Sequence, residues 1–265
     1  MSGPATIGSS GRRRRGGAVI PPAIAFAVLL GIWELIVRGF DIKPLVLPAP
    51  SRIAQAINAD WSGWLAAAWV TGQEAFGGFV LALMAALVLA VAATAAPVIE
   101  RALLPVVTVV QLVPVVALAP ALVIGLGFDL RPRILVAALI TFAPLTVNTI
   151  AGLQSVEPEA LEVMRSVHAS GWEILLKLRL PQALPYLAAA TRVCVGLALV
   201  GAMVAEWQGS SEGLGYVFSR SQKSLLTDRM WAAVFVLAMM GVVGLVAIGL
   251  LERRLLRWRP ARLRN

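Results

Sequence analysis

Long apolar stretches constrain the fold of this chain more than any other feature of its sequence. They lie at roughly residues 19–38, 64–95, 102–127, 132–153, 183–206 and 231–252. About 20 consecutive apolar residues cross a bilayer as one helix, so we expect an all-α polytopic membrane protein with six transmembrane helices. The alternative is a soluble protein with very apolar helices. It fits poorly because only 14% of the residues are charged, against about 25% in a typical soluble domain.

The distribution of basic residues predicts the topology. Arginines cluster near both termini, in residues 11–15 and 252–264. Cytoplasmic segments beside membrane spans are rich in Lys and Arg, so the net charge of +9 needs no nucleic-acid partner. We expect basic cytoplasmic tails at 1–18 and 253–265 around a transmembrane domain at 19–252. The first apolar run ends without a small-residue cleavage site and is interpreted as a retained helix.

The residue types exclude several kinds of chemistry. Cys194 is the only cysteine and His168 the only histidine, so an intrachain disulfide and a multi-histidine metal site are excluded. The sequence has no G-x-x-x-x-G-K-[ST] pattern to cradle ATP phosphates. We therefore expect no enzymatic activity, no metal and no cofactor in this chain.

A charged loop at 154–182 separates the fourth and fifth apolar runs. Pro158 suits the first turn of a helix. The residues Leu161, Met164 and Val167 follow at a spacing of three. That spacing places them on one face, so the loop is predicted to begin with a short amphipathic helix.

A second short helix is predicted after the segment HASG. Ser170 and Glu173 have the S-x-x-E spacing of a capping box, and Pro181 and Pro185 are expected to end the helix. The apolar face of this loop is expected to be buried against another surface. Two covers remain open: the protein's own cytoplasmic end or the lipid surface, and a groove on a partner protein.

The same loop resembles the EAA loop of permeases from binding-protein-dependent ABC importers. That motif is E-A-A, three residues, Gly, nine residues, a hydrophobic residue, one residue and Leu-Pro. The spacing fits throughout, although Val-Met replaces Ala-Ala and a histidine, which tolerates a left-handed backbone better than most residues, replaces the glycine. The matching residues are Glu162, Val163, Met164, His168, Leu178, Leu180 and Pro181.

Four further segments resemble the nitrate, sulfonate and taurine group of these permeases. They are VLPAPSRIAQAI (46–57), VPVVALAPALVIGLGF (113–128), FAPLTVNTIAGLQSV (142–156) and EGLGYVF (212–218). TGQEAFGGF and VGAMVAEW are slightly closer to the branch for hydroxymethylpyrimidine and riboflavin precursors. The solute implied is a small organic molecule or anion from one of these classes.

The resemblance implies the fold and partners of a type I ABC importer permease in the bacterial plasma membrane. Such a subunit works with ABC ATPase subunits, an extracytoplasmic solute-binding protein and a second copy of itself. ATP is bound by the ATPase, and a cytoplasmic coupling helix docks in a cleft of that subunit. The coupling residues implied are Glu159, Leu161, Glu162, Val163, Met164, Arg165, Ser166, Val167, His168, Ala169, Ser170, Gly171, Leu180 and Pro181.

Polar residues and prolines inside the apolar runs are candidates for the solute pathway, since ionisable groups are costly in a membrane. Glu74 and Arg192 either pair between helices or line the pathway. Pro114, Pro120 and Pro144 are expected to kink their spans. The predicted pathway residues are Glu74, Gln111, Pro114, Asn148 and Arg192.

Two other functional classes compete with an importer subunit. A secondary transporter driven by an ion gradient often shows inverted repeats, and the two halves of this sequence show none. A membrane scaffold without transport activity would give no uptake defect on deletion.

Overall fold

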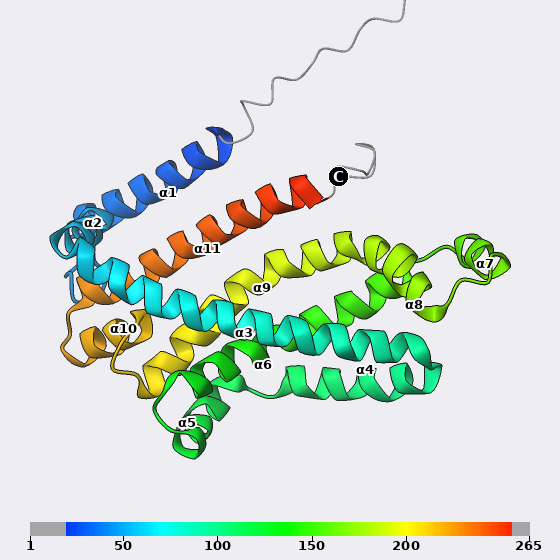
Figure 1. The fold of residues 1–265 in the computed structure, drawn as a ribbon. Coiled ribbons are helices and arrows are strands. Elements are labelled where there is room, and N and C mark those ends of the chain that lie inside the picture. Colours follow the sequence, from blue (N-terminus) through cyan, green and yellow to red (C-terminus); the bar gives the residue numbers. More distant parts are fainter. Residues whose placement is uncertain (1–19, 256–265) are drawn as a thin grey trace, which may run out of the picture.

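In the computed structural model, which describes residues 20–255, every regular element is a helix (Figure 1). The expected tail at 1–18 and the end of the other tail, 256–265, lie outside the described residues. Arg253 and Arg254 belong to the last helix. The order is α1 (Ile20–Gly39), α2 (Pro50–Ala59), α3 (Trp61–Ala95), α4 (Pro97–Leu112), α5 (Val115–Leu126), α6 (Leu130–Gln154), α7 (Pro158–Ser166), α8 (Gly171–Ile174), a π-helical segment (Leu175–Arg179), α9 (Leu180–Gly209), α10 (Leu214–Lys223) and α11 (Thr227–Leu255).

Five helices are long and apolar enough to cross a membrane: α1, α3, α6, α11 and the continuous helix Gly171–Gly209. The pair α4 and α5 makes a sixth span if it is counted as one. The span expected at 102–127, with a kink at its prolines, is broken into two helices that meet at 89°. Val113 is extended there (φ −69°, ψ 124°), as the residue before a proline prefers.

The centre of the bundle is formed by α3, α6 and α9, which pack on one another along small residues. Gly78, Ala82, Ala86 and Ala90 form one buried stripe on α3. A Cβ added at Gly78 would lie 2.5 Å from the Cβ of Ala137 on α6. Small residues let helix backbones approach closely in a membrane, so this stripe explains the tight contact between α3 and α6.

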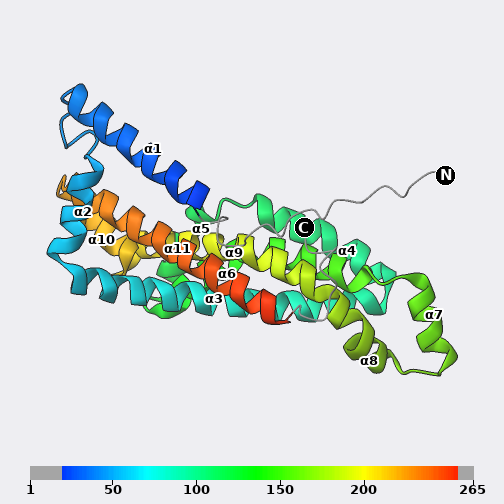
Figure 2. The same ribbon diagram turned by 90° about the horizontal axis from the view of Figure 1, so that it is seen from above.

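The two ends of the bundle carry different short helices. Figures 1 and 2 show α7 and α8 at one end and α2 and α10 at the other, while α1 begins and α11 ends on the side facing α7. Figure 2 also shows α1 leaving the bundle at an angle. We call the first end the α7 end and the second the α10 end.

At the α10 end, α1 is fixed by hydrogen bonds to Ser51 and by an aromatic cluster. The carboxylate of Glu34 accepts hydrogen bonds from the backbone N–H of Ser51 at 3.0 Å and from its hydroxyl at 2.7 Å. Trp33 packs against Trp231 of α11, with ring centroids 5.3 Å apart. The serine of the segment VLPAPS therefore joins α2 to α1.

Candidate functional site

The predicted loop forms two helices joined by a tight turn. His168 has a φ of +55°, so it takes the left-handed conformation expected at the glycine position of the motif. Ser170 and Glu173 form the predicted capping box: Ser170 Oγ accepts from the Glu173 backbone N–H at 3.3 Å, and the Ser170 N–H donates to Glu173 Oε2 at 3.0 Å. These contacts fix the direction in which the chain leaves the turn.

Hydrogen bonds also fix the charge of Glu173. Lys177 Nζ lies 2.8 Å from Glu173 Oε1. This ammonium, together with the backbone N–H and hydroxyl of Ser170, lowers the pKa of Glu173 to about 2. The carboxylate that holds the turn is therefore ionised throughout the physiological pH range.

The second helix of the loop does not end where the sequence predicts. Pro181 lies in the first turn of α9, and Pro185 lies inside α9, so the helix that begins at Gly171 continues to Gly209. The π-helical segment Leu175–Arg179 comes directly before Pro181. A proline has no N–H to donate and clashes with the carbonyl four residues earlier, and a widened turn relieves that conflict.

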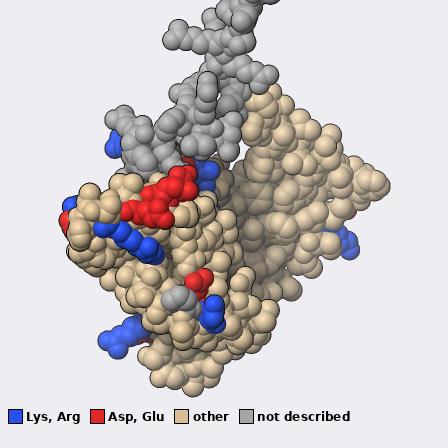
Figure 3. All heavy atoms as spheres, turned by 90° about the vertical axis from the view of Figure 1, so that its right-hand side faces the viewer, with Lys and Arg blue, Asp and Glu red and all other residues tan. Residues whose placement is uncertain are grey.

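The surface of α7 is uncovered. None of its nine residues is buried. Leu161 and Met164 of the predicted stripe are half-buried, whereas Val163 is 64% exposed, Val167 67% and Trp172 of α8 66%. Acidic and basic side chains gather beside each other on one half of the α7 end (Figure 3). The loop thus presents apolar and charged groups together, with nothing in the described chain covering them.

The candidate pair Glu74–Arg192 is not formed. Arg192, on α9, pairs instead with Glu252 of α11, and Glu74, on α3, pairs with Arg133 of α6. Glu74 is fully buried, so it offers nothing to a solute in this conformation.

The other predicted pathway residues lie apart from that pair. Gln111 and Pro114, at the break between α4 and α5, are exposed. Asn148, on α6, is half-buried and donates from Nδ2 to the carbonyl of Pro144 at 2.8 Å. The side-chain amide of Asn148 therefore bonds to the backbone carbonyl of Pro144, one helical turn earlier in α6.

Glu74 belongs to a buried polar cluster that joins four segments near the α10 end. Glu206, on α9, is also fully buried. Its carboxylate accepts from the hydroxyl of Thr71 at 2.6 Å and from the backbone N–H of Gly215 at 2.5 Å. Thr71 Oγ1 in turn accepts from the N–H of Leu214 at 2.9 Å. The cluster therefore ties the start of α10 to α3 and α9.

Sequence reasoning missed the partners of this cluster. The polar residues inside the apolar runs include Glu74 and Glu206, but Arg133 lies at the start of its span and gave no sign of reaching Glu74. The glycines of the segment Gly213–Gly215 belong to a family-like motif, but the sequence alone gives no physical reason for them. The structure supplies one, because a Cβ at either glycine would collide with Glu206.

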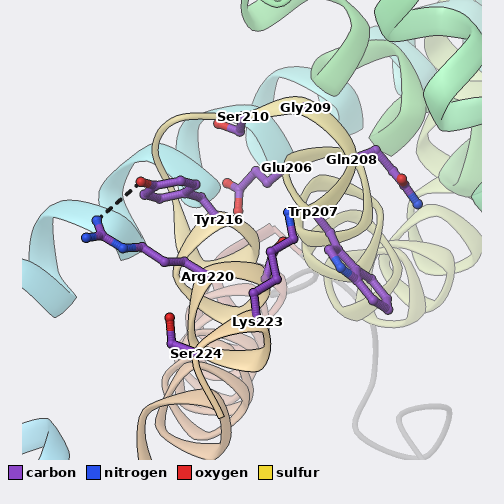
Figure 4. A pocket seen from close by; sticks show the side chains of 10 residues that line it. Glu206, Trp207, Gln208, Gly209, Ser210, Tyr216, Arg220, Lys223 and Ser224 are labelled. Atoms are coloured by element: carbon purple, nitrogen blue, oxygen red, sulfur yellow. Dashed lines mark hydrogen bonds between the residues drawn. The ribbon is translucent and has the colours of Figure 1, made fainter. Parts of the chain in front are cut away.

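A polar cavity of about 450 Å³ opens at the α10 end (Figure 4). Arg220 donates from Nη1 to the hydroxyl of Tyr216 at 3.3 Å across its wall. Lys223 also lines it. Within residues 20–255, neither Arg220 nor Lys223 forms an ion pair, so their part of the wall carries positive charge, while the carboxyl group of Glu206 lines another part. No group of three or more His, Cys, Asp or Glu side chains in that part of the chain is placed to hold a metal.

Known proteins resemble this chain over nearly all of its length. The formylaminopyrimidine transport permease protein ThiX of Halalkalibacterium halodurans is 32% identical over 247 residues, covering 93% of this chain and 98% of that protein. The riboflavin transport system permease protein RibX of Chloroflexus aurantiacus is 34% identical over 241 residues, covering 89% and 88%. The taurine transport system permease protein TauC of Escherichia coli is 28% identical over 239 residues, covering 88% and 87%.

The fold has a solved counterpart in a chain of the MetNI methionine ABC transporter in inward-facing conformations. The TM-score is 0.57 at 16% identity, covering 73% of this chain and 94% of that chain. The family described as the inner membrane component of binding-protein-dependent transport systems matches residues 78–257. With its apolar spans and this fold, the chain belongs to that family of ABC transporter permeases, which are membrane transport proteins and not enzymes.

Proposed function

We propose that this chain forms the translocation pathway of an ATP-driven solute importer and receives movement from a separate ATPase through α7. The observation that carries the proposal is the uncovered surface of α7, which stands at one end of the bundle without a buried residue. An exposed apolar face on a short helix suits a groove on a partner protein. The α7 end is then cytoplasmic, and so are both termini.

Charge on and directly before α7 favours a protein partner over the lipid surface, because glutamates there outnumber the one basic residue, Arg165. Glu157, Glu159 and Glu162 are all exposed on or directly before α7. The cytoplasmic leaflet is negatively charged and repels such a surface. A basic and apolar cleft on the ATPase would accept it, with Val163, Val167 and His168 inserted and the capping box holding the turn.

We further propose that the complex contains two copies of this chain, two ATPase subunits and an extracytoplasmic binding protein at the α10 end. Arg220 and Lys223 form no ion pair with the described residues and support the last point, since they would attract acidic side chains of such a protein. For the solute, the permeases for formylaminopyrimidine and riboflavin support a small heterocycle, and the taurine permease a small anion. Gln111, Pro114 and Asn148 are the proposed pathway residues.

Purification of the tagged chain from its own membranes in mild detergent tests the coupling proposal. We expect an ATPase with a phosphate-binding loop to co-purify in near-equal amount. If no ATPase co-purifies, even after crosslinking through residues 159–181, the coupling role of α7 is wrong, and a secondary transporter driven by an ion gradient becomes the better explanation.

The solute class needs a separate test. A binding protein that co-purifies with the complex can be screened by thermal shift against a formylaminopyrimidine, riboflavin, taurine and nitrate. Stabilisation by one of the two heterocycles alone would support the heterocycle class, and stabilisation by taurine or nitrate alone would support the anion class.

A further inference from the structure

Two buried carboxyl groups near the α10 end share one arginine. Glu74 and Glu206 are fully buried, and the side chain of Arg133 is only 12% exposed. Arg133 pairs with Glu74 Oε1 through Nη1 and uses its other nitrogens on the backbone carbonyls of Asp129 and Phe128, at 3.0 and 3.4 Å. The nearby carboxylate of Asp129 is 54% exposed and lies 3.6 Å from Arg131. The buried charges are therefore two acids and one base.

One oxygen of the two carboxyl groups lacks a hydrogen-bond donor in the described part of the chain. Both oxygens of Glu206 already accept, one from Thr71 and one from the backbone of Gly215. Glu74 Oε1 accepts from Arg133. Glu74 Oε2 is buried and has no donor among the described residues, and Glu206 is its neighbour across the helix interface, because Thr71, one turn before Glu74 on the buried face of α3, donates to Glu206 Oε1 at 2.6 Å. A buried oxygen without a donor is costly, and more so when it carries charge.

We propose that Glu74 is a neutral carboxylic acid that holds a proton on Oε2 and donates it as a hydrogen bond to the carboxylate of Glu206. Each oxygen of the pair then has a partner, and the single negative charge on Glu206 balances the single positive charge on Arg133. The cluster is thus a binding site for one proton, at the point where α3, α6, α9 and the start of α10 meet.

The two other proton arrangements fit the geometry less well. A proton on Glu206 weakens an acceptor that faces two donors, the hydroxyl of Thr71 and the N–H of Gly215. Two ionised carboxylates that are neighbours in a buried cluster repel each other, and Glu74 Oε2 stays without a donor. A proton on Glu74 gives every polar atom of the pair a complementary partner and leaves both oxygens of Glu206 as strong acceptors for their present donors.

A matched pair of isosteric substitutions tests the assignment. The amide of E74Q reproduces the neutral acid, because it donates to Glu206 and accepts from Arg133. The amide of E206Q removes the balancing charge and sets an N–H₂ group against existing donors. The measurement uses the chain purified in detergent together with any ATPase that co-purifies with it. We expect E74Q to melt within roughly 2 °C of wild type and E206Q to melt roughly 5–15 °C lower than wild type. Equal losses, or a larger loss for E74Q, would overturn the proposal.

Infrared spectroscopy gives a readout that stability alone does not, and it remains decisive if E206Q does not fold. The wild-type minus E74Q difference spectrum should contain the carbonyl band of one protonated carboxylic acid. If the difference shows only ionised carboxylate, Glu74 is not the proton holder.

Discussion

At the scale of single residues, two glycines explain the segment EGLGYVF. Gly213 has a φ of +93°, which is costly for any residue with a Cβ. A Cβ there, or at Gly215, would also collide with the carboxylate of Glu206. The two glycines therefore let the backbone close around a buried carboxylate and donate to it.

Substitution of Gly213 tests that role. Gly213→Ala is expected to cost roughly 2–3 kcal/mol, which lowers the melting temperature by roughly 5–10 °C. Gly196→Ala is the control, because its Cβ would meet nothing within 4 Å and alanine favours a helix interior. Differential scanning fluorimetry in detergent checks both, and equal melting temperatures would contradict the role of Gly213.

Reversal of one charge on α7 tests the coupling proposal. Glu162→Lys should leave the chain in the membrane and folded, since Glu162 is exposed, and should reduce recovery of the ATPase about tenfold or more, because a charge placed against like charge costs more than about 1.4 kcal/mol. Glu212→Lys, an exposed charge reversal at the α10 end, should leave recovery unchanged. Normal recovery with Glu162→Lys would remove this residue from the interface.

Long-range ion pairs could not be predicted from the sequence. Spacing identified the capping box of Ser170 and Glu173 and the turn at His168, because both are local. Glu74 and Arg192 were compared as partners only because both lie in apolar runs. Their true partners, Arg133 and Glu252, are set by how the helices pack, and a single sequence does not encode that pairing in any local pattern.

At the scale of elements, the turn between α7 and α8 depends on the left-handed residue His168. His168→Gly should preserve or improve recovery of the ATPase, since glycine adopts this conformation freely. His168→Val should reduce recovery severalfold, because a β-branched side chain is a strong outlier at positive φ. The comparison uses the same pull-down, with membrane content measured by immunoblot; equal recovery for both variants would mean that the turn conformation is not needed for docking.

Prolines show the limit of predicting helix boundaries from sequence. Pro120, Pro144 and Pro185 lie inside continuous helices, whereas the chain breaks before Pro114. Each proline removes the same backbone hydrogen bond, so the sequence signal is alike. Pro144 lies in α6, which packs against both α3 and α9, while Val113 and Pro114 are exposed. Pro105 is exposed and still lies inside α4, so burial separates Pro144 from Pro114 but does not by itself decide which proline ends a helix.

At the scale of the whole molecule, the proposed topology places the α7 end on the cytoplasmic side of the membrane and the α10 end on the outer side. Ser166→Cys on α7 should react with a membrane-impermeant thiol reagent only in opened cells, and Lys223→Cys on α10 should react in intact cells. The single native cysteine, Cys194, is buried and gives little background. Labelling of both positions from the same side would contradict the topology.

The unbroken helix from Gly171 to Gly209 links the proposed docking loop to the buried carboxylate cluster. Its 39 residues span roughly 58 Å at about 1.5 Å per residue. When such a helix moves as a rigid body, a tilt of roughly 10° about its midpoint moves each end by about 5 Å, in opposite directions. If α7 docks on an ATPase as proposed, a push on the loop moves the Glu206 end of the helix in the opposite direction, and the hydrogen bonds of Glu206 resist that movement.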